Sequence, residues 1–517
     1  MLRNQKTIMI RTKNSRAIAL LLAFQLPLIV ASAQTLYELS VQASAASGDH
    51  TPLWLNANKY GLSSLDKTNG YLRAGVFHPL TGDMEKKVEL GYGADVAVAA
   101  NYTSTVVVQQ AYAEARWLKG VLTIGSKEQP MELKSQELST GSQTLGVNAR
   151  PVPQVRIALP DYWQIPYTAG WLHLKGHIAY GITTDDGWQK DFTNKQTRYT
   201  EHTLLHTKAG YIKIGKEGKP LSLEGGLEMA CQFGGKSHVF DDDGLHHYDN
   251  ISNPKAFLHA FIPGGSDEID GETYQNEEGN HLGSWLVRIN YDHEAWGVSV
   301  YADQFFEDQS MMFHLDYDGY GSGQEWNERK ENRYFLYNLK DILLGAELRL
   351  KDGRWLQKAV VEYMHSKYQS GPVYHDHTQN ISDHISGIDN YYNHGMFTGW
   401  QHWGQVMGNP LYTSPLYNED GHVRVENNRF VAWHLGLQGS PLPRLSYRLL
   451  ATWQRGYGTY YQLFANPEEN TSLLAEAYYK WPKGGWSAKL GLGMDSGKIY
   501  GNNYGLQVTV MRHFVSK

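Results

Sequence analysis

Cysteine and long apolar runs are both scarce in this chain of 517 residues. The single Cys231 excludes a disulfide framework. Beyond residue 30 no apolar stretch approaches 18 residues, and the mean hydropathy is −0.49. A helical membrane protein needs such stretches, so that class is excluded. The sequence also has no concentrated basic region, so we expect no nucleic-acid partner.

The N-terminus has the three parts of a secretory signal peptide. A basic region without acidic residues precedes the apolar run 17–30, and Ala31-Ser32-Ala33 then forms a cleavage site before Gln34. The alternative is an uncleaved anchor helix, but 14 residues fall short of the roughly 20 that span a bilayer. We therefore predict a signal peptide at 1–33 and a mature chain at 34–517. Its removal leaves 42 basic and 53 acidic residues, a net charge of −11.

The mature sequence is rich in tyrosine, tryptophan and glycine, and its apolar residues recur at every second position. Successive side chains of a strand point to opposite faces, so this period predicts strands with one apolar face. The clearest examples are 90–100, 221–231, 285–291, 344–350, 445–453 and 486–494. A soluble all-β protein would show the same alternation in any one segment. Many such segments with aromatic ends favour a transmembrane barrel, whose strands face lipid on one side and a polar lumen on the other.

The C-terminus carries a final strand of the same kind. Tyr504, Leu506, Val508 and Val510 alternate strictly, and Phe514 stands three residues from the end. A terminal amphipathic strand with a late aromatic residue resembles the signal that the outer-membrane barrel assembly machinery recognises. At roughly 10 residues per strand, the mature chain holds about 16 to 18 strands. We therefore predict an all-β, antiparallel barrel in the bacterial outer membrane, surrounded by lipid.

Three regions do not alternate. Residues 126–170 contain five prolines, which are rare in central sheet positions, and are predicted to plug or flank the barrel. Residues 235–282 and 367–428 are polar and rich in Gly, Asn, Asp and His. They are predicted to be long extracellular loops that can carry recognition.

Three stretches resemble the Wzi family of capsule assembly proteins. They are SGDHTPLWLNANKYGL at 47–62, STGSQTLGVNARPVPQVRI at 139–157 and YYNHGMFTGWQHWGQVMGNPLY at 391–412. The resemblance extends over nearly all of the mature chain. It implies an outer-membrane barrel of about 18 strands with a small helical or irregular plug element on the periplasmic side. It further implies a lectin that attaches or organises capsular polysaccharide, without enzymatic activity or a cofactor.

The stretch 391–412 supplies the residue types that bind sugars. Aromatic rings cover the CH faces of a pyranose, and amides or charged groups bind its hydroxyls. The candidates here are Tyr391, Tyr392, Trp400, His402, Trp403 and Asn409. The alternative is that these aromatic residues pack on each other and on the barrel rim.

Two arginines beside the prolines are further candidates, Arg150 and Arg156. Their guanidinium groups suit the carboxylates of an acidic polysaccharide. Alternatively, they pair with lumenal Asp and Glu and hold a plug in place.

The sequence carries no convincing metal or catalytic motif. His375, His377, His384 and His394, and Asp241–Asp243 before His246 and His247, have irregular spacing, which favours solvated loops. His293-Glu294 begins a zinc-protease pattern, but Gly297 stands where the second histidine is needed. No nucleophile elbow or phosphate-binding loop occurs. Paired carboxylates of a glycosidase remain open, because their separation depends on the fold.

We therefore predict a non-enzymatic outer-membrane lectin for capsular or other surface polysaccharide. A passive porin is the main alternative, and a barrel-borne hydrolase is the third.

Overall fold

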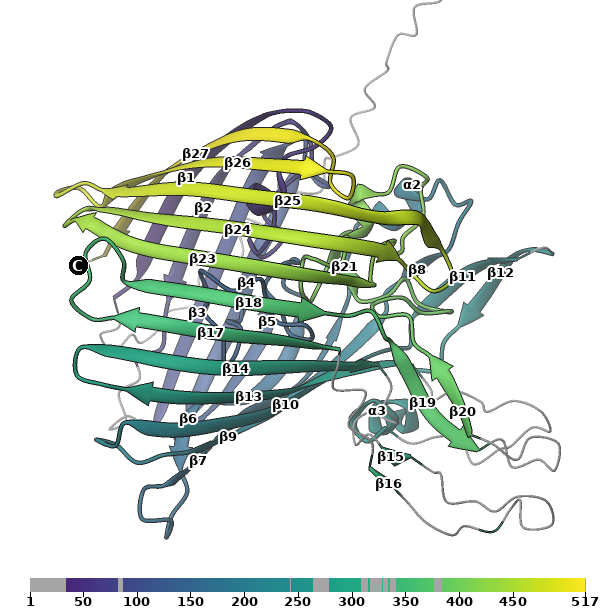
Figure 1. Cartoon of the computed structure of the whole chain (residues 1–517), viewed down its shortest axis with the longest axis horizontal. Coiled ribbons are helices and arrows are strands. Elements are labelled where there is room, and N and C mark those ends of the chain that lie inside the picture. Colours follow the sequence, from purple (N-terminus) through teal and green to yellow (C-terminus); the bar gives the residue numbers. More distant parts are fainter. Residues whose placement is uncertain are drawn as a thin grey trace, which may run out of the picture.

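The computed structural model describes residues 34–81, 87–241, 243–263, 279–307, 315–316, 328, 333–334, 341–375 and 384–516. Its main feature is a closed antiparallel sheet of 18 strands (Figure 1). This confirms the predicted barrel. The predicted signal peptide at 1–33 lies outside the described residues.

Each wall strand pairs with the next along the chain, and β27 returns to pair with β1 from Leu36↔Val515 to Ser47↔Tyr504. The wall strands are β1 (Leu36–Ser47), β2 (Thr68–His78), β3 (Val88–Ala100), β4 (Val106–Trp117), β5 (Gly120–Ser126), β6 (Gln154–Gln164), β7 (Leu172–Ile182), β9 (Leu204–Ile214), β10 (Leu221–Phe233), β13 (Asn280–Asp292), β14 (Trp296–Glu307), β17 (Ile342–Leu350), β18 (Lys358–His365), β23 (Phe430–Leu442), β24 (Leu445–Gly458), β25 (Leu463–Lys480), β26 (Trp486–Gly497) and β27 (Asn503–Val515).

The connections between wall strands carry short elements. Small sheets form from β8 (Tyr199–Glu201), β11 (Lys236–Asp241) and β12 (Gly244–Asp249), and from the pairs β15 (Leu315–Asp316) with β16 (Arg333–Tyr334), β19 (Ser370–His375) with β20 (His384–Ile388), and β21 (Gln401–His402) with β22 (Gln405–Val406). The helices are α1 (Leu53–Asn56), α2 (Trp188–Phe192), α3 (Pro254–Phe261) and the 3-10 turn η5 (Pro415–Tyr417). Among the described residues, no helix has the length and apolar character needed to cross a membrane.

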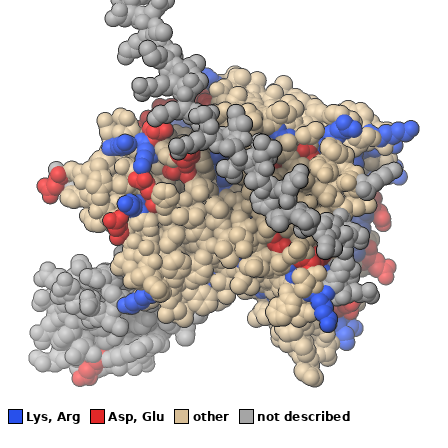
Figure 2. All heavy atoms as spheres, turned by 180° about the vertical axis from the view of Figure 1, so that it is seen from behind, with Lys and Arg blue, Asp and Glu red and all other residues tan. Residues whose placement is uncertain are grey.

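The two faces of the wall have the polarity that a bilayer requires. On β3, Leu90 and Val98 are more than half exposed on the outer face, whereas Asp95 is fully buried on the inner face. Figure 2 shows a broad outer surface of uncharged residues, with Lys, Arg, Asp and Glu concentrated toward its margins. Exposed apolar side chains over such an area are stable in lipid and unfavourable in water. The soluble all-β alternative is therefore rejected.

The two ends of the barrel differ in connection length. Turns such as 118–119, 293–295 and 443–444 are short and lie at the end that holds the C-terminus, whereas 127–153 and 366–429 are long and lie at the other end (Figure 1). In outer-membrane barrels the short turns face the periplasm and the long loops face outward. Exposed tryptophans gather at the short-turn end, at positions 117, 171, 296, 355, 481 and 486. This is the aromatic girdle expected at a membrane interface.

The lumen is filled by three of the long connections, which fold inward. We call them the inner segments: 48–67 with α1, 127–153, and 389–428. Their buried residues, including Trp54, Leu138 and Trp400, form one cluster with inward-facing wall residues such as Tyr301 and Leu450. The inner segments therefore make the apolar core of a barrel that otherwise has a polar lumen.

The inner segments differ from the predicted boundaries. Within the predicted plug region 126–170, only 127–153 lies in the lumen, and the rest includes wall strand β6 and the turn that leads to β7 at Leu172. Pro160 is tolerated in β6 because the β6–β7 register shifts between Leu159 and Trp163. The plug was predicted on the periplasmic side, but all three inner segments leave the wall at the long-loop end. Of the predicted loop 367–428, residues 389–428 fold inward.

Candidate functional site: an outer vestibule above a filled lumen

Carboxylates of the barrel wall hold inner segment 127–153 in place. Glu362 on β18, 1% exposed, accepts hydrogen bonds from Ser139 Oγ at 2.6 Å, Thr140 N at 2.8 Å and Thr140 Oγ1 at 2.7 Å. Tyr301 on β14 donates a further bond to the same carboxylate at 2.6 Å. Buried hydrogen bonds to a charged acceptor are among the stronger polar interactions in a protein.

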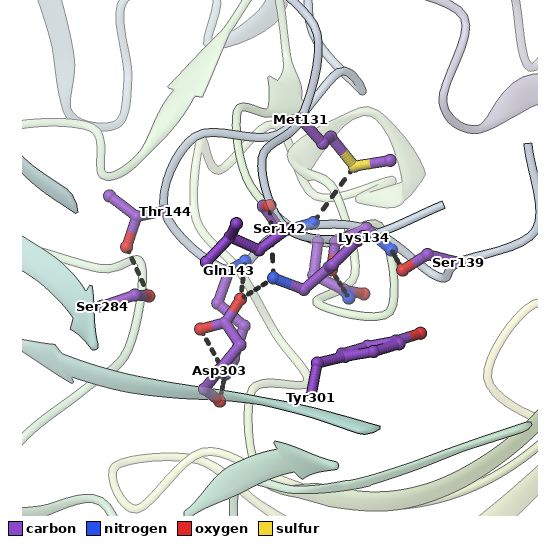
Figure 3. Close-up of polar contacts among 12 residues, drawn as sticks. Met131, Lys134, Ser139, Ser142, Gln143, Thr144, Ser284, Tyr301 and Asp303 are labelled. Carbon is purple, nitrogen blue, oxygen red and sulfur yellow. Dashed lines mark hydrogen bonds and ion pairs between the residues drawn. The ribbon is translucent and has the colours of Figure 1, made fainter. Parts of the chain in front are cut away.

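A second wall carboxylate, Asp303 on β14, extends this attachment (Figure 3). It pairs with the buried Lys134 ammonium at 2.7 Å and accepts the Gln143 backbone N–H at 3.1 Å. Next to it, Thr144 and Ser284 share a hydroxyl hydrogen bond of 2.7 Å. The inner segment is thus bound to β13, β14 and β18 through side chains that are buried with it.

Asn148 joins all three inner segments. Its Oδ1 accepts the Asn58 backbone N–H at 3.0 Å, and its Nδ2 donates to Val406 O at 3.0 Å. Trp400 adds a bond from Nε1 to Thr144 O at 2.9 Å. The asparagine at the centre of the stretch 139–157 therefore has a structural role inside the lumen.

The predicted sugar-binding residues of 391–412 lie in this interior. Tyr391, Tyr392, Trp400, His402 and Asn409 are each at most 4% exposed. The Tyr392 and Tyr412 rings lie 4.1 Å apart, so protein atoms already cover the aromatic faces. Burial lowers the pKa of His402 to about 4, and the neutral ring is within 2.8 Å of Arg150 O. These aromatic residues therefore pack within the protein interior, which is the alternative that the sequence left open for them.

The two candidate arginines also lie in the lumen, and among the described residues neither has a carboxylate partner. The Arg150 guanidinium stands 4.1 Å over the half-buried Trp403 ring, and its Nη2 donates to Thr103 Oγ1 at 2.7 Å. Burial lowers the pKa of Arg150 to about 10. Arg156 lies on wall strand β6, and no ion pair is found for it in the described part of the chain.

The candidate metal ligands of the sequence do not form a metal site among the described residues. Within those ranges, no group of three or more His, Cys, Asp or Glu is arranged to hold a metal ion. Of the histidines and aspartates considered in the sequence, His377 and Asp242 lie outside the described residues.

The outer end holds a cavity of about 930 Å³, which we call the vestibule. It lies among residues of four connections, 183–203, 234–279, 366–429 and 459–462, at the outer ends of β10, β13 and β14. The inner segment 389–428 contributes Asn390, Asn393 and His394 to its lining. The vestibule is therefore the outward-facing surface of the plug, bordered by the loops.

The vestibule combines exposed aromatic rings with amides, the two guanidinium groups of Arg198 and Arg424, and the carboxylates of Asp249, Glu307, Asp389 and Glu426. Tyr461 is 76% exposed and Tyr248 is 44% exposed, and the amides of Asn250 and Gln462 lie in the same lining. Arg198 donates from Nη1 to Gly395 O at 2.7 Å, while its buried Nε has no partner within the described residues. Burial and the nearby Arg424 charge lower the pKa of Arg198. This set can cover a sugar ring, bind its hydroxyls and bind an acidic group.

No family model matches the chain, and no curated protein matches it. Solved structures similar to it include OprD of Pseudomonas aeruginosa, at 9% identity and TM-score 0.42, covering 94% of this chain and 95% of that one. OpdQ of the same organism is at 9% identity and TM-score 0.45, covering 94% and 100%. A loop-deletion mutant of OmpT, an outer membrane protein of Vibrio cholerae, is at 8% identity and TM-score 0.34, covering 93% and 100%. The closed sheet of 18 strands and its apolar outer face show that the chain is an outer-membrane β-barrel.

Sequence reasoning found part of the vestibule. The regions 235–282 and 367–428 stood out as polar and aperiodic, and both contribute to its lining. Arg198 and Tyr461 were missed because they come from connections without an unusual composition. Only closure of the barrel brings these two residues to the same rim.

Proposed function

We propose that the protein is a non-catalytic lectin that binds surface polysaccharide at the vestibule. The observation that carries this proposal is the contrast between a lumen filled by anchored inner segments and a hollow, aromatic-lined outer end. A passive diffusion porin needs an open lumen, and the buried bonds of Glu362 and Asp303 oppose opening. The resemblance to capsule assembly proteins suggests capsular polysaccharide as the polymer.

The proposed contacts in the vestibule differ from those predicted within 391–412. Tyr461 offers a free ring face for the CH patch of a pyranose, since three quarters of its surface is exposed. Asn250 and Gln462 are placed to bind hydroxyls, and Arg198 to bind an acidic substituent.

The proposal is tested with Tyr461→Ala and a matched control, Tyr167→Ala. Tyr167 is fully exposed in the β6–β7 turn at the opposite end of the barrel. Loss of one stacking ring is worth about 1 kcal/mol, so we expect roughly five- to tenfold weaker binding of purified polysaccharide by Tyr461→Ala only. Equal binding by both variants and wild type would contradict the vestibule assignment.

A deletion strain tests the cellular role. Without the protein, cell-bound polysaccharide should fall and released polysaccharide should rise, while the total stays constant. If bound and total polysaccharide fall together, the protein acts in synthesis or export and the lectin proposal is wrong.

A solute channel is the second candidate. A cavity of about 210 Å³ remains between inner segment 127–153 and wall strands β6–β10, and this favours a passage along that side of the lumen. A channel predicts stable conductance steps in planar bilayers, whereas the plugged lectin should conduct little. Conductance comparable to that of open 18-stranded porins would favour the channel.

A further inference from the structure

The lumenal cavity beside β6–β10 is lined by three cationic side chains, one histidine and two carboxylates. Its walls include Lys127 from the inner segment, Arg150 at the end of that segment, and Arg156 on β6. His177 on β7 also lines it and is 8% exposed. Arg156 pairs in register with Ala179, two residues from His177, so both side chains point inward as diagonal neighbours.

Several polar atoms at this cavity have no partner among the described residues. His177 Nε2 and Arg150 Nε are buried without a hydrogen bond. Within the described ranges, no carboxylate lies at ion-pair distance from Arg156, and no hydrogen bond to its guanidinium is found. Unpaired polar and charged groups are unfavourable in a protein interior. Several of them around one cavity therefore indicate that a ligand pairs with them there.

The nearby carboxylates do not supply that partner, because other groups engage them. Glu132 pairs with Lys175, and Glu228 accepts bonds from Tyr211 OH at 2.7 Å and Leu145 N at 3.2 Å. Lys127 is likewise paired, with Glu114. Across the described ranges neither guanidinium group is in an ion pair, and the single remaining carboxylate of the lining, Glu228, offsets only one of their two positive charges.

We propose that this cavity binds a small organic acid through its carboxylate. Arg156 binds the carboxylate with its two-pronged donor geometry, and His177 Nε2 and Arg150 Nε complete the donor set. A volume of about 210 Å³ lies below the usual range of ligand pockets, which limits the ligand to monosaccharide size. The site is distinct from the vestibule and does not depend on polysaccharide binding there.

Calorimetric titration of the purified barrel with D-glucuronate and with D-glucose tests this site, because the two sugars differ in the carboxylate. We expect glucuronate to bind with one site per chain and glucose to bind at least about tenfold more weakly. Equal binding of the two sugars, or no binding of glucuronate, would overturn the proposal.

Four variants locate the bound anion. Arg156→Gln should weaken glucuronate binding at least about tenfold, and Arg156→Lys, which keeps the charge but removes the fork, should weaken it several-fold. Arg354→Gln, in the exposed turn between β17 and β18 and outside both cavities, should leave it unchanged. If Arg198→Gln abolishes binding and Arg156→Gln does not, the anion binds at the vestibule and this inference is wrong. Circular dichroism checks the fold of each variant, and Arg156→Lys decides between the two sites if Arg156→Gln does not fold.

Discussion

The attachment of inner segment 127–153 to Glu362 gives the sharpest prediction. Replacing Glu362 with leucine keeps a similar volume and removes the acceptor of four hydrogen bonds. The Thr140 backbone N–H is then buried without a partner, at a cost of about 1–3 kcal/mol, and the two hydroxyl bonds from Ser139 and Thr140 are lost at about 0.5–1.5 kcal/mol each. The docked state of the segment should weaken by roughly 4 kcal/mol, a factor of about a thousand in its release.

Hydrogen exchange of peptides covering 134–150 measures this release directly, and planar bilayer conductance measures its consequence. The matched control is Glu347→Leu. Glu347 is also a buried wall carboxylate, but it pairs with Arg349 at 2.7 Å and Arg288 at 3.3 Å, both on wall strands. Exchange should rise in Glu362→Leu and stay near wild type in Glu347→Leu. Equal exchange in the two variants would refute the idea that wall carboxylates fix the plug.

Three further outcomes are expected. Trp400→Ala should destabilise the barrel by about 3–5 kcal/mol and lower its thermal midpoint, because Trp400 is 2% exposed. Trp403→Ala, at a half-buried position, should lower the free energy of unfolding by less. Lowering the pH from 6.5 to 4 should reduce the free energy of unfolding of the inner segments in urea by up to roughly 3 kcal/mol. Unfolded His402 takes up a proton in this range, whereas folded His402, with a pKa of about 4, largely does not. The variant His402→Asn should show a weaker dependence on pH. Cys231 is fully buried beside Ala256 of α3, so a maleimide should label it only when Ala256→Glu displaces α3; equal labelling of wild type would contradict this packing.

A comparison of the predicted sugar-binding residues with the residues of the vestibule shows what the sequence can predict about the site and what it cannot. Aromatic and amide residues in 391–412 have the composition of a sugar site, but Tyr392 and Trp400 are core residues. Composition cannot separate the two roles, because both need large rings beside hydrogen-bonding groups. Tyr461 has no such cluster around it in sequence, and its partners in the vestibule come from three distant connections.

Period-two alternation by itself determined the barrel, because a wall between lipid and a polar lumen imposes that period on every strand. The polar, aperiodic composition of 235–282 and 367–428 likewise indicated two of the long connections at the outer end. Whether a polar connection extends outward or folds into the lumen was decided only by tertiary structure. That choice depends on buried partners such as Glu362 for Thr140 and Val406 for Asn148, which lie more than 200 residues apart in the chain. No local pattern records such pairs, since each residue alone is an ordinary polar side chain.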